Sequence, residues 1–230
     1  MSRDFIHQMN YIMKYYPKTD KLLSAISNSG ETLLIGGALR EFKDNELNKI
    51  PRDFDIVVDT DDCILESILL PYSPQKNRFG GYKVDCNGLI IDVWCLKNTW
   101  AFKENIIKCK PEEYSSRLQD TVFLNIDAIV YNLSRDIWYD DKYEEAMRTR
   151  ILDIVLRENP QLALNIVRTI LLKQKYSMQL SQKLRGVICD FVYICPDFLQ
   201  HLMQVQVSHY KCTLINEVKL KNEIDTICNQ

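Results

Sequence analysis

The chain has 230 residues, of which 46% are hydrophobic and 26% charged, so it is long and apolar enough to bury a sizeable core. Its formal net charge is -2 and its isoelectric point is about 6.0. These values exclude a surface that is strongly basic all over, and any nucleic-acid contact must therefore be local.

Eight cysteines and three histidines are spread along the chain, and no two cysteines form a C-x-x-C pair. This spacing predicts no structural zinc site. The first residues carry no apolar signal run, and no segment is long and apolar enough to span a membrane. We therefore expect a cytoplasmic protein with reduced, buried cysteines and no membrane partner.

The first part of the chain alternates between helical and strand-like patterns. Helices are predicted over 4–16, 19–29, 37–43 and 61–70, and strands over 32–35 and 54–58. Thr19 and Asp20 are the N-cap candidates of the second helix, and Pro71 ends the last one. Between these elements, residues 44–52 are predicted to form a polar loop.

A hairpin is the clearest local feature. Asn87-Gly88 separates two strand-like runs, residues 81–86 and 89–96. Asn-Gly between two such runs is typical of a two-residue type I′ turn. With a loop of that length, Lys83 lies opposite Asp92 across the two strands.

Two short motifs lie close together in the chain. An apolar run enters the turn Gly36-Gly37, and Arg40 follows about one helical turn later. Glycines let the backbone approach a phosphate closely, and a helix beginning there offers N–H groups to an anion. Asp53 and Asp55 then open a β-branched strand, where residues two apart point to one face. A phosphate cradle beside two convergent carboxylates is what metal-assisted nucleotidyl transfer needs.

In this order and spacing, the motifs resemble the nucleotidyltransferase superfamily that includes DNA polymerase β. The chain looks most like the head domain of class II CCA-adding enzymes and bacterial-type poly(A) polymerases. The resemblance covers residues 31–176, because Ile126–Asn132 is similar to the family's Ile-Asn-Ala-Leu-Ala-Tyr-Asn segment and Glu158–Thr169 to its neck helix. It implies an α+β fold, with a nucleotidyltransferase head (a mixed sheet with flanking helices) over 1–140 and a shortened helical neck and C-terminal region over 141–230.

The resemblance also implies a two-metal site. One Mg2+ ion would activate the attacking hydroxyl, and the other would hold the triphosphate of the NTP substrate. Asp53 and Asp55 are the expected catalytic metal ligands. Asp92, an acid in the middle of a strand-like run, is either a third catalytic metal ligand or the cross-strand ion-pair partner of Lys83.

The candidate nucleotide-binding residues are Gly36, Gly37, Arg40, Arg78 and Arg168. An arginine can bind phosphate oxygens through two hydrogen bonds. The alternative for Arg40 is an ion pair with Glu41 or Asp44. Arg78 lies in a segment that resembles the family's basic-Phe-Gly element, and Arg168 lies on the neck helix, where the alternative is a plain surface arginine.

The chain also departs from the family pattern. The family's Arg-Arg-Asp falls on Thr121-Val122-Phe123, and the Asp and Arg that read the base edge fall on Asn159 and Leu162. The next family arginine falls on Asn165. Leucine can neither donate nor accept a hydrogen bond, so the pair that reads the base is missing.

The sequence therefore predicts an enzyme, a metal-dependent nucleotidyltransferase. It would move an NMP from an NTP to an acceptor hydroxyl, in first place an RNA (tRNA) 3′ end, without ordered C-C-A addition. Two alternatives remain open. One is transfer to a protein or small-molecule hydroxyl, and the other is a nucleotide-binding module that has lost turnover.

Overall fold

The computed structural model describes residues 2–44, 50–77 and 80–229. The chain divides into two compact units, the first formed by Met1–Thr121 with Asp127–Asp141 and the second by Val122–Ile126 with Lys142–Gln230.

The first unit combines helices with one sheet. Its described helices are α1 (Ser2–Met13), α2 (Pro17–Ser27), α3 (Gly37–Lys43), α4 (Asp62–Leu69), α5 (Trp100–Lys103) and α6 (Tyr114–Arg117). Its described strands are β1 (Glu31–Ile35), β2 (Asp53–Asp59), β3 (Gln75–Lys76), β4 (Tyr82–Cys86), β5 (Leu89–Cys95), β6 (Val130–Asn132) and β7 (Ile137–Tyr139). Their order in the sheet is β3-β4-β5-β2-β1-β6-β7. Strands β2 and β5 run parallel and the other neighbours antiparallel, so the predicted mixed sheet with flanking helices is confirmed.

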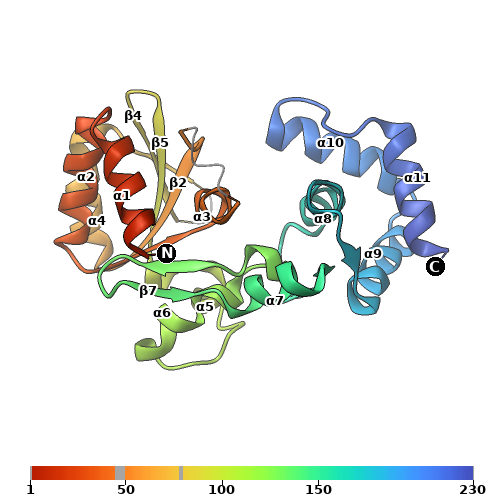
Figure 1. Cartoon of the computed structure of the whole chain (residues 1–230). Helices are drawn as coiled ribbons and strands as arrows, with labels where there is room; N and C mark the ends of the chain where they lie inside the picture. The colour runs from red at the N-terminus through yellow and green to blue at the C-terminus, as the bar shows by residue number, and fades with distance from the viewer. Residues whose placement is uncertain (1, 45–49, 78–79, 230) are drawn as a thin grey trace. The chain divides into compact units, whose positions relative to one another are not determined.

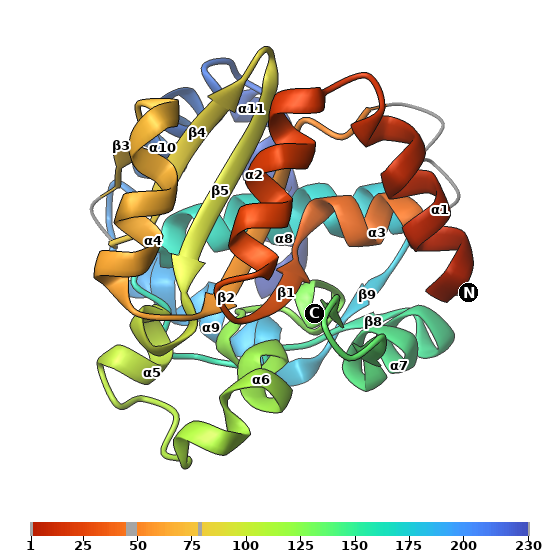
Figure 2. The same ribbon diagram turned by 90° about the vertical axis from the view of Figure 1, so that its left-hand side faces the viewer.

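Helices α1, α2 and α4 cover one face of this sheet (Figures 1 and 2). The apolar residues Phe54, Ile56 and Val58 alternate along β2 and are buried. Register places Tyr131 of β6 on the face of Ile56, and its ring lies 5.2 Å from that of Phe5 in α1. The period-two pattern of β2 thus supplies the core beneath these helices.

The opposite face has its own core at one end. Val57 of β2 belongs to a buried cluster with Leu33, Leu96, Phe102, Leu118 and Val130. Asp53 and Asp55 lie on the same face as Val57 because they are separated from it by even numbers of residues. They are only half-buried and do not belong to that cluster. The carboxylates of Asp53 and Asp55 are therefore partly accessible to solvent on this face of the sheet.

The predicted hairpin is confirmed, and one predicted helix start is wrong. Asn87 and Gly88 have φ angles of 60° and 91°, as a type I′ turn requires, and Lys83 pairs with Asp92. Helix α2 begins at Pro17, where a missing N–H costs nothing, and not at an N-cap at Thr19 or Asp20. Thr19 is buried inside the helix instead.

The second unit is mainly helical. It contains α7 (Asp141–Thr149), α8 (Leu162–Tyr176), α9 (Gln182–Ile194), α10 (Phe198–Tyr210) and α11 (Glu217–Cys228), with a short parallel pair of β8 (Ile151–Leu152) and β9 (Gln179–Leu180). Ile166, Val167 and Ile170 of α8 are fully buried. Helix α8 packs against α10, and α9 packs against α11. No helix in the described ranges is long and apolar enough to cross a membrane.

A disulfide joins Cys189 of α9 to Cys228 of α11, with their Cα atoms 5.6 Å apart. The expectation that the cysteines are all reduced and buried is therefore wrong for this pair. It is also wrong for Cys63 and Cys212, which are exposed thiols. Residues 39 positions apart in the chain become neighbours only through helix packing, which cysteine spacing alone does not indicate.

Candidate active site

The glycine turn Gly36-Gly37 lies beside Asp55 of β2, at the end of β1. Gly36 precedes α3 with a φ of 83°, a conformation that favours glycine. A Cβ atom at this position would lie 2.5 Å from Oδ2 of Asp55. The Asp55 carboxylate thus lies against the backbone of the turn, so the two motifs that the sequence singled out are neighbours in the structure.

The three predicted carboxylates share one face of the sheet. Asp53 and Asp55 are two residues apart on β2, and the parallel register sets Asp92 of β5 beside Asp55. The side chain of Asp53 is 17% exposed and that of Asp92 is 12% exposed. Their placement on neighbouring strands agrees with the expected arrangement, whereas their role in catalysis stays a prediction.

Arg52 is a charged neighbour that the sequence reasoning missed. Its Nε donates to Oδ2 of Asp53 at 2.9 Å. The hydrogen bond to Asp53 raises the pKa of the Arg52 guanidinium, partial burial lowers it, and the charges of Asp53, Asp55 and Asp92 raise it further. The carboxylates therefore act together on one exposed cation. Its position directly before Asp53 in the chain is the sequence feature that could have indicated this contact.

Asp92 forms the ion pair that was its alternative role. Nζ of Lys83 lies 2.9 Å from Oδ2 of Asp92 across the β4–β5 pair. Within the described ranges, no group of three or more His, Cys, Asp or Glu side chains converges on one point that could hold a metal ion. The carboxylate oxygens of Asp53 and Asp55 suit a hard cation such as Mg2+, and their role as metal ligands stays a prediction.

Arg40 lies beside the glycine turn and has a partner that was not among those expected. A Cβ at Gly37 would be 3.8 Å from NH2 of Arg40. The NH1 group of Arg40 pairs with Oδ1 of Asp127, and both side chains are largely buried. The expected alternative, a pair with Glu41 or Asp44, missed this contact because 87 residues separate Arg40 from Asp127.

The other predicted nucleotide contacts are Arg78 and Arg168. Arg78 lies outside the described residues. Arg168 lies on α8, in the second unit, and is half-buried. Near the start of α8, Nδ2 of Asn165 donates to Oδ1 of Asn159 at 2.7 Å. Asn159 and Asn165, which fall where the resembled family carries charged groups, thus form a pair of hydrogen-bonded amides. Leu162 is the first residue of α8.

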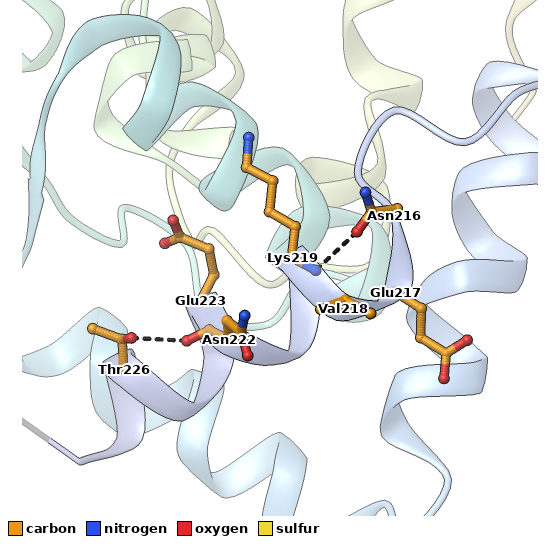
Figure 3. Close-up of a pocket in the computed structure, with 7 residues that line it drawn as sticks. All are labelled: Asn216, Glu217, Val218, Lys219, Asn222, Glu223 and Thr226. Atoms are coloured by element: carbon orange, nitrogen blue, oxygen red, sulfur yellow. Dashed lines mark hydrogen bonds between the residues drawn. The ribbon is translucent and has the colours of Figure 1, made fainter.

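Two cavities lie outside the carboxylate group. One of about 610 Å³ follows α11, where Asn216 caps the helix by accepting from the backbone N–H of Lys219 (Figure 3). None of the predicted site residues lines it. The other, of about 480 Å³, lies in the first unit and includes Lys83, the ion-pair partner of Asp92.

The mixed sheet with flanking helices, followed by a helical region, matches the fold of solved CCA-adding enzymes. The chain is similar to a CCA-adding enzyme solved with CTP (TM-score 0.67, 14% identity, covering 98% of this chain and 54% of that one). It is also similar to an apo CCA-adding enzyme, with a TM-score of 0.62 and 15% identity over 94% of this chain and 53% of that one. A third similar structure is the Thermotoga maritima CCA-adding enzyme complexed with tRNA-CCA, with a TM-score of 0.61 and 14% identity over 94% of this chain and 51% of that one. The chain spans about half the length of these structures. No family model and no curated protein sequence matches it. At these identities the likeness shows the fold.

Proposed function

We propose that this protein is a Mg2+-dependent nucleotidyltransferase that moves an NMP from an NTP to the 3′ hydroxyl of a tRNA-type RNA. The observation that carries the proposal is the contact between the turn at Gly36 and the carboxylate of Asp55, which joins a phosphate cradle to a metal ligand. Similar structures were solved with CTP, with ATP and with tRNA, which supports an NTP and an RNA end as the substrates.

In this proposal each residue of the site has a separate task. Bound Mg2+ supplies charge neutralisation for the triphosphate and lowers the pKa of the acceptor hydroxyl. Asp53 and Asp55 would hold the metal, and the backbone at Gly36 and Gly37 would approach the triphosphate. The exposed guanidinium of Arg52 offsets repulsion between the carboxylates and is placed to exchange Asp53 for a phosphate oxygen.

We further propose that the protein does not build an ordered C-C-A end. Oδ1 of Asn159 already accepts two hydrogen bonds, from Asn165 and from the backbone N–H of Gln161. Leu162 offers neither a donor nor an acceptor. The acid and the arginine with which the family reads base edges are therefore absent at these positions, and we expect discrimination between bases to be weak.

A nucleotide-binding module without turnover is the second candidate. It is favoured by the pairing of Arg40 with Asp127, which neutralises a charge expected to hold the triphosphate. The loss of the family's Arg-Arg-Asp at 121–123 points the same way. Binding of an NTP without incorporation into any acceptor would distinguish this candidate from an enzyme.

The test is incubation of the full chain with each labelled NTP and Mg2+, with and without bulk tRNA. We expect label to enter RNA, and Asp53→Asn or Asp55→Asn to lower incorporation about 100-fold or more, since an amide binds Mg2+ poorly. The melting temperature should change little, because the relief of repulsion between the carboxylates opposes the loss, in Asp53→Asn, of the exposed ion pair with Arg52. Asp59→Asn, at the exposed end of the same strand, is the matched control and should retain activity. Near-normal turnover in either site variant would refute the proposed mechanism.

A further inference from the structure

The sheet order gives the site two distinct sides. Gly36 follows β1, the neighbour of β2 on one side, while β5 and then β4 lie on the other side. In phosphoryl transfer, the attacking and leaving oxygens are roughly in line across the phosphorus. If the glycine turn holds the triphosphate, as proposed above, the acceptor hydroxyl must approach from the side of β5 and β4.

The cavity of about 480 Å³ lies on that side. The register aligns Gln75, Lys83, Asp92 and Asp55 in one row across β3, β4, β5 and β2, so their side chains share a face. Gln75 and Lys83 both line the cavity. Adjacent strands are about 4.8 Å apart, which sets Lys83 roughly 10 Å from Asp55 in this row. The cavity thus begins next to the carboxylates and extends away from the glycine turn.

The chemistry of the cavity suits a nucleotide. Its lining combines the ammonium of Lys83, the hydroxyl of Ser73, the amides of Gln75 and Asn87, the ring of Tyr72, the apolar side chain of Ile90 and the carboxylate of Asp85. One oxygen of that carboxylate accepts from the backbone N–H of Gly88 at 2.7 Å. Ammonium and hydroxyl groups bind phosphate oxygens, and an aromatic ring can stack on any base. The side chain of Lys83 is 48% exposed, so it can reach a ligand without a change of fold.

We propose that this cavity binds the terminal nucleotide of the acceptor RNA, with Lys83 contacting its phosphodiester. The inference rests on the proposed function, because it assigns the acceptor side of that site. On RNA binding, the ammonium of Lys83 then leaves its ion pair with Asp92 and binds a phosphate oxygen instead. The exchange uncovers the Asp92 carboxylate at the place where the acceptor hydroxyl arrives. Asp92 is therefore an ion-pair partner without RNA and faces the hydroxyl when RNA is bound.

The test is RNA binding by wild type and Lys83→Met, measured by fluorescence anisotropy over a range of salt concentrations. The probe is a short single-stranded RNA with a free 3′ hydroxyl, and a circular RNA of the same sequence lacks a terminus. For the linear RNA, we expect Lys83→Met to weaken binding about 5-fold and to reduce the slope against salt by about one unit. Binding of the circular RNA and of NTP should be unchanged.

Lys97→Met is the matched control, because Lys97 is also a half-exposed lysine in a surface ion pair, with Asp61 at 2.6 Å. It should leave RNA binding unchanged. An equal effect of both variants, an equal loss for circular RNA, or no binding of linear RNA by the wild type would overturn the inference. Binding does not need turnover, so Lys83-dependent binding without incorporation would refute the proposed function alone. Incorporation with an unaltered Lys83→Met salt slope would refute the inference alone.

Discussion

Gly36 is the residue with the least freedom to change in the candidate site. Its φ of 83° disfavours any other residue, and a Cβ there would press on the Asp55 carboxylate. Backbone strain and crowding thus coincide at one position. The two effects can be separated, because Gly88 has a φ of 91° with no atom within 4 Å of a built Cβ.

We expect Gly36→Ala to lower both stability and nucleotidyl transfer. The backbone strain should cost about 1 kcal/mol or more, and the displaced Asp55 should lose its place as a metal ligand. Gly88→Ala should show a comparable fall in melting temperature with little change in activity. Thermal melts and incorporation assays on both variants measure the two effects. Full activity in Gly36→Ala would show that the contact with Asp55 does not matter for the reaction.

Local periodicity was sufficient to predict part of this site. The shared face of Asp53 and Asp55 follows from strand geometry, and the place of Asp92 opposite Lys83 follows from the length of the Asn-Gly turn. The Arg40–Asp127 pair could not be predicted, because strands β2 to β5 lie between these two residues in the chain. Contacts between distant segments depend on topology, which a one-sequence pattern does not specify.

At the scale of elements, the second unit is held by contacts between its own helices. Nζ of Lys173 in α8 donates to Oε2 of Glu223 in α11 at 2.7 Å. Oε1 of the same carboxylate accepts from Nε2 of Gln174 at 3.2 Å. The disulfide ties α11 to α9 as well. Apolar periodicity predicted helices in this unit, but it could not indicate which of them pair, because an apolar face does not identify its partner.

The Lys173–Glu223 pair predicts a pH dependence of stability. The hydrogen bond from Lys173 holds the pKa of the Glu223 carboxyl below its ordinary value of 4.5. A lowered pKa in the folded state means that the contribution is present above pH 4.5 and is lost as the pH falls through the folded-state value.

Glu223→Gln should therefore lower the free energy of unfolding near neutral pH, by about 1 kcal/mol or less for a partly exposed pair. The difference from wild type should vanish in acid. Thermal melts between neutral pH and pH values well below 4.5 measure it, and Glu104→Gln, at an exposed residue of the first unit, controls for the change in net charge. A difference that persists unchanged in acid would contradict this origin.

At the scale of the whole molecule, the charge and the site agree on the kind of binding to expect. A net charge of -2 gives no general attraction to RNA, so in the proposed function an RNA end is held by local groups such as Lys83. The fold matches only about half the length of the CCA-adding enzymes it resembles. In the proposed function, the choice of nucleotide depends on the polar groups near the start of α8, where the sequence resembles the family's neck helix.

The product of the reaction tests that dependence directly. A pocket that hydrogen-bonds a base rejects the wrong one because polar groups would be left unsatisfied, and a pocket without such groups discriminates weakly. Here Leu162 offers no hydrogen bond, and Asn159 and Asn165 bond to each other. We therefore expect tRNA that lacks C-C-A, incubated with all four NTPs, to gain a single nucleotide or a short run of one type. Sequencing of the 3′ ends measures this, with the Asp55→Asn variant as the blank. Faithful C-C-A synthesis would show that other residues read the base and that the loss of the neck pair has been compensated.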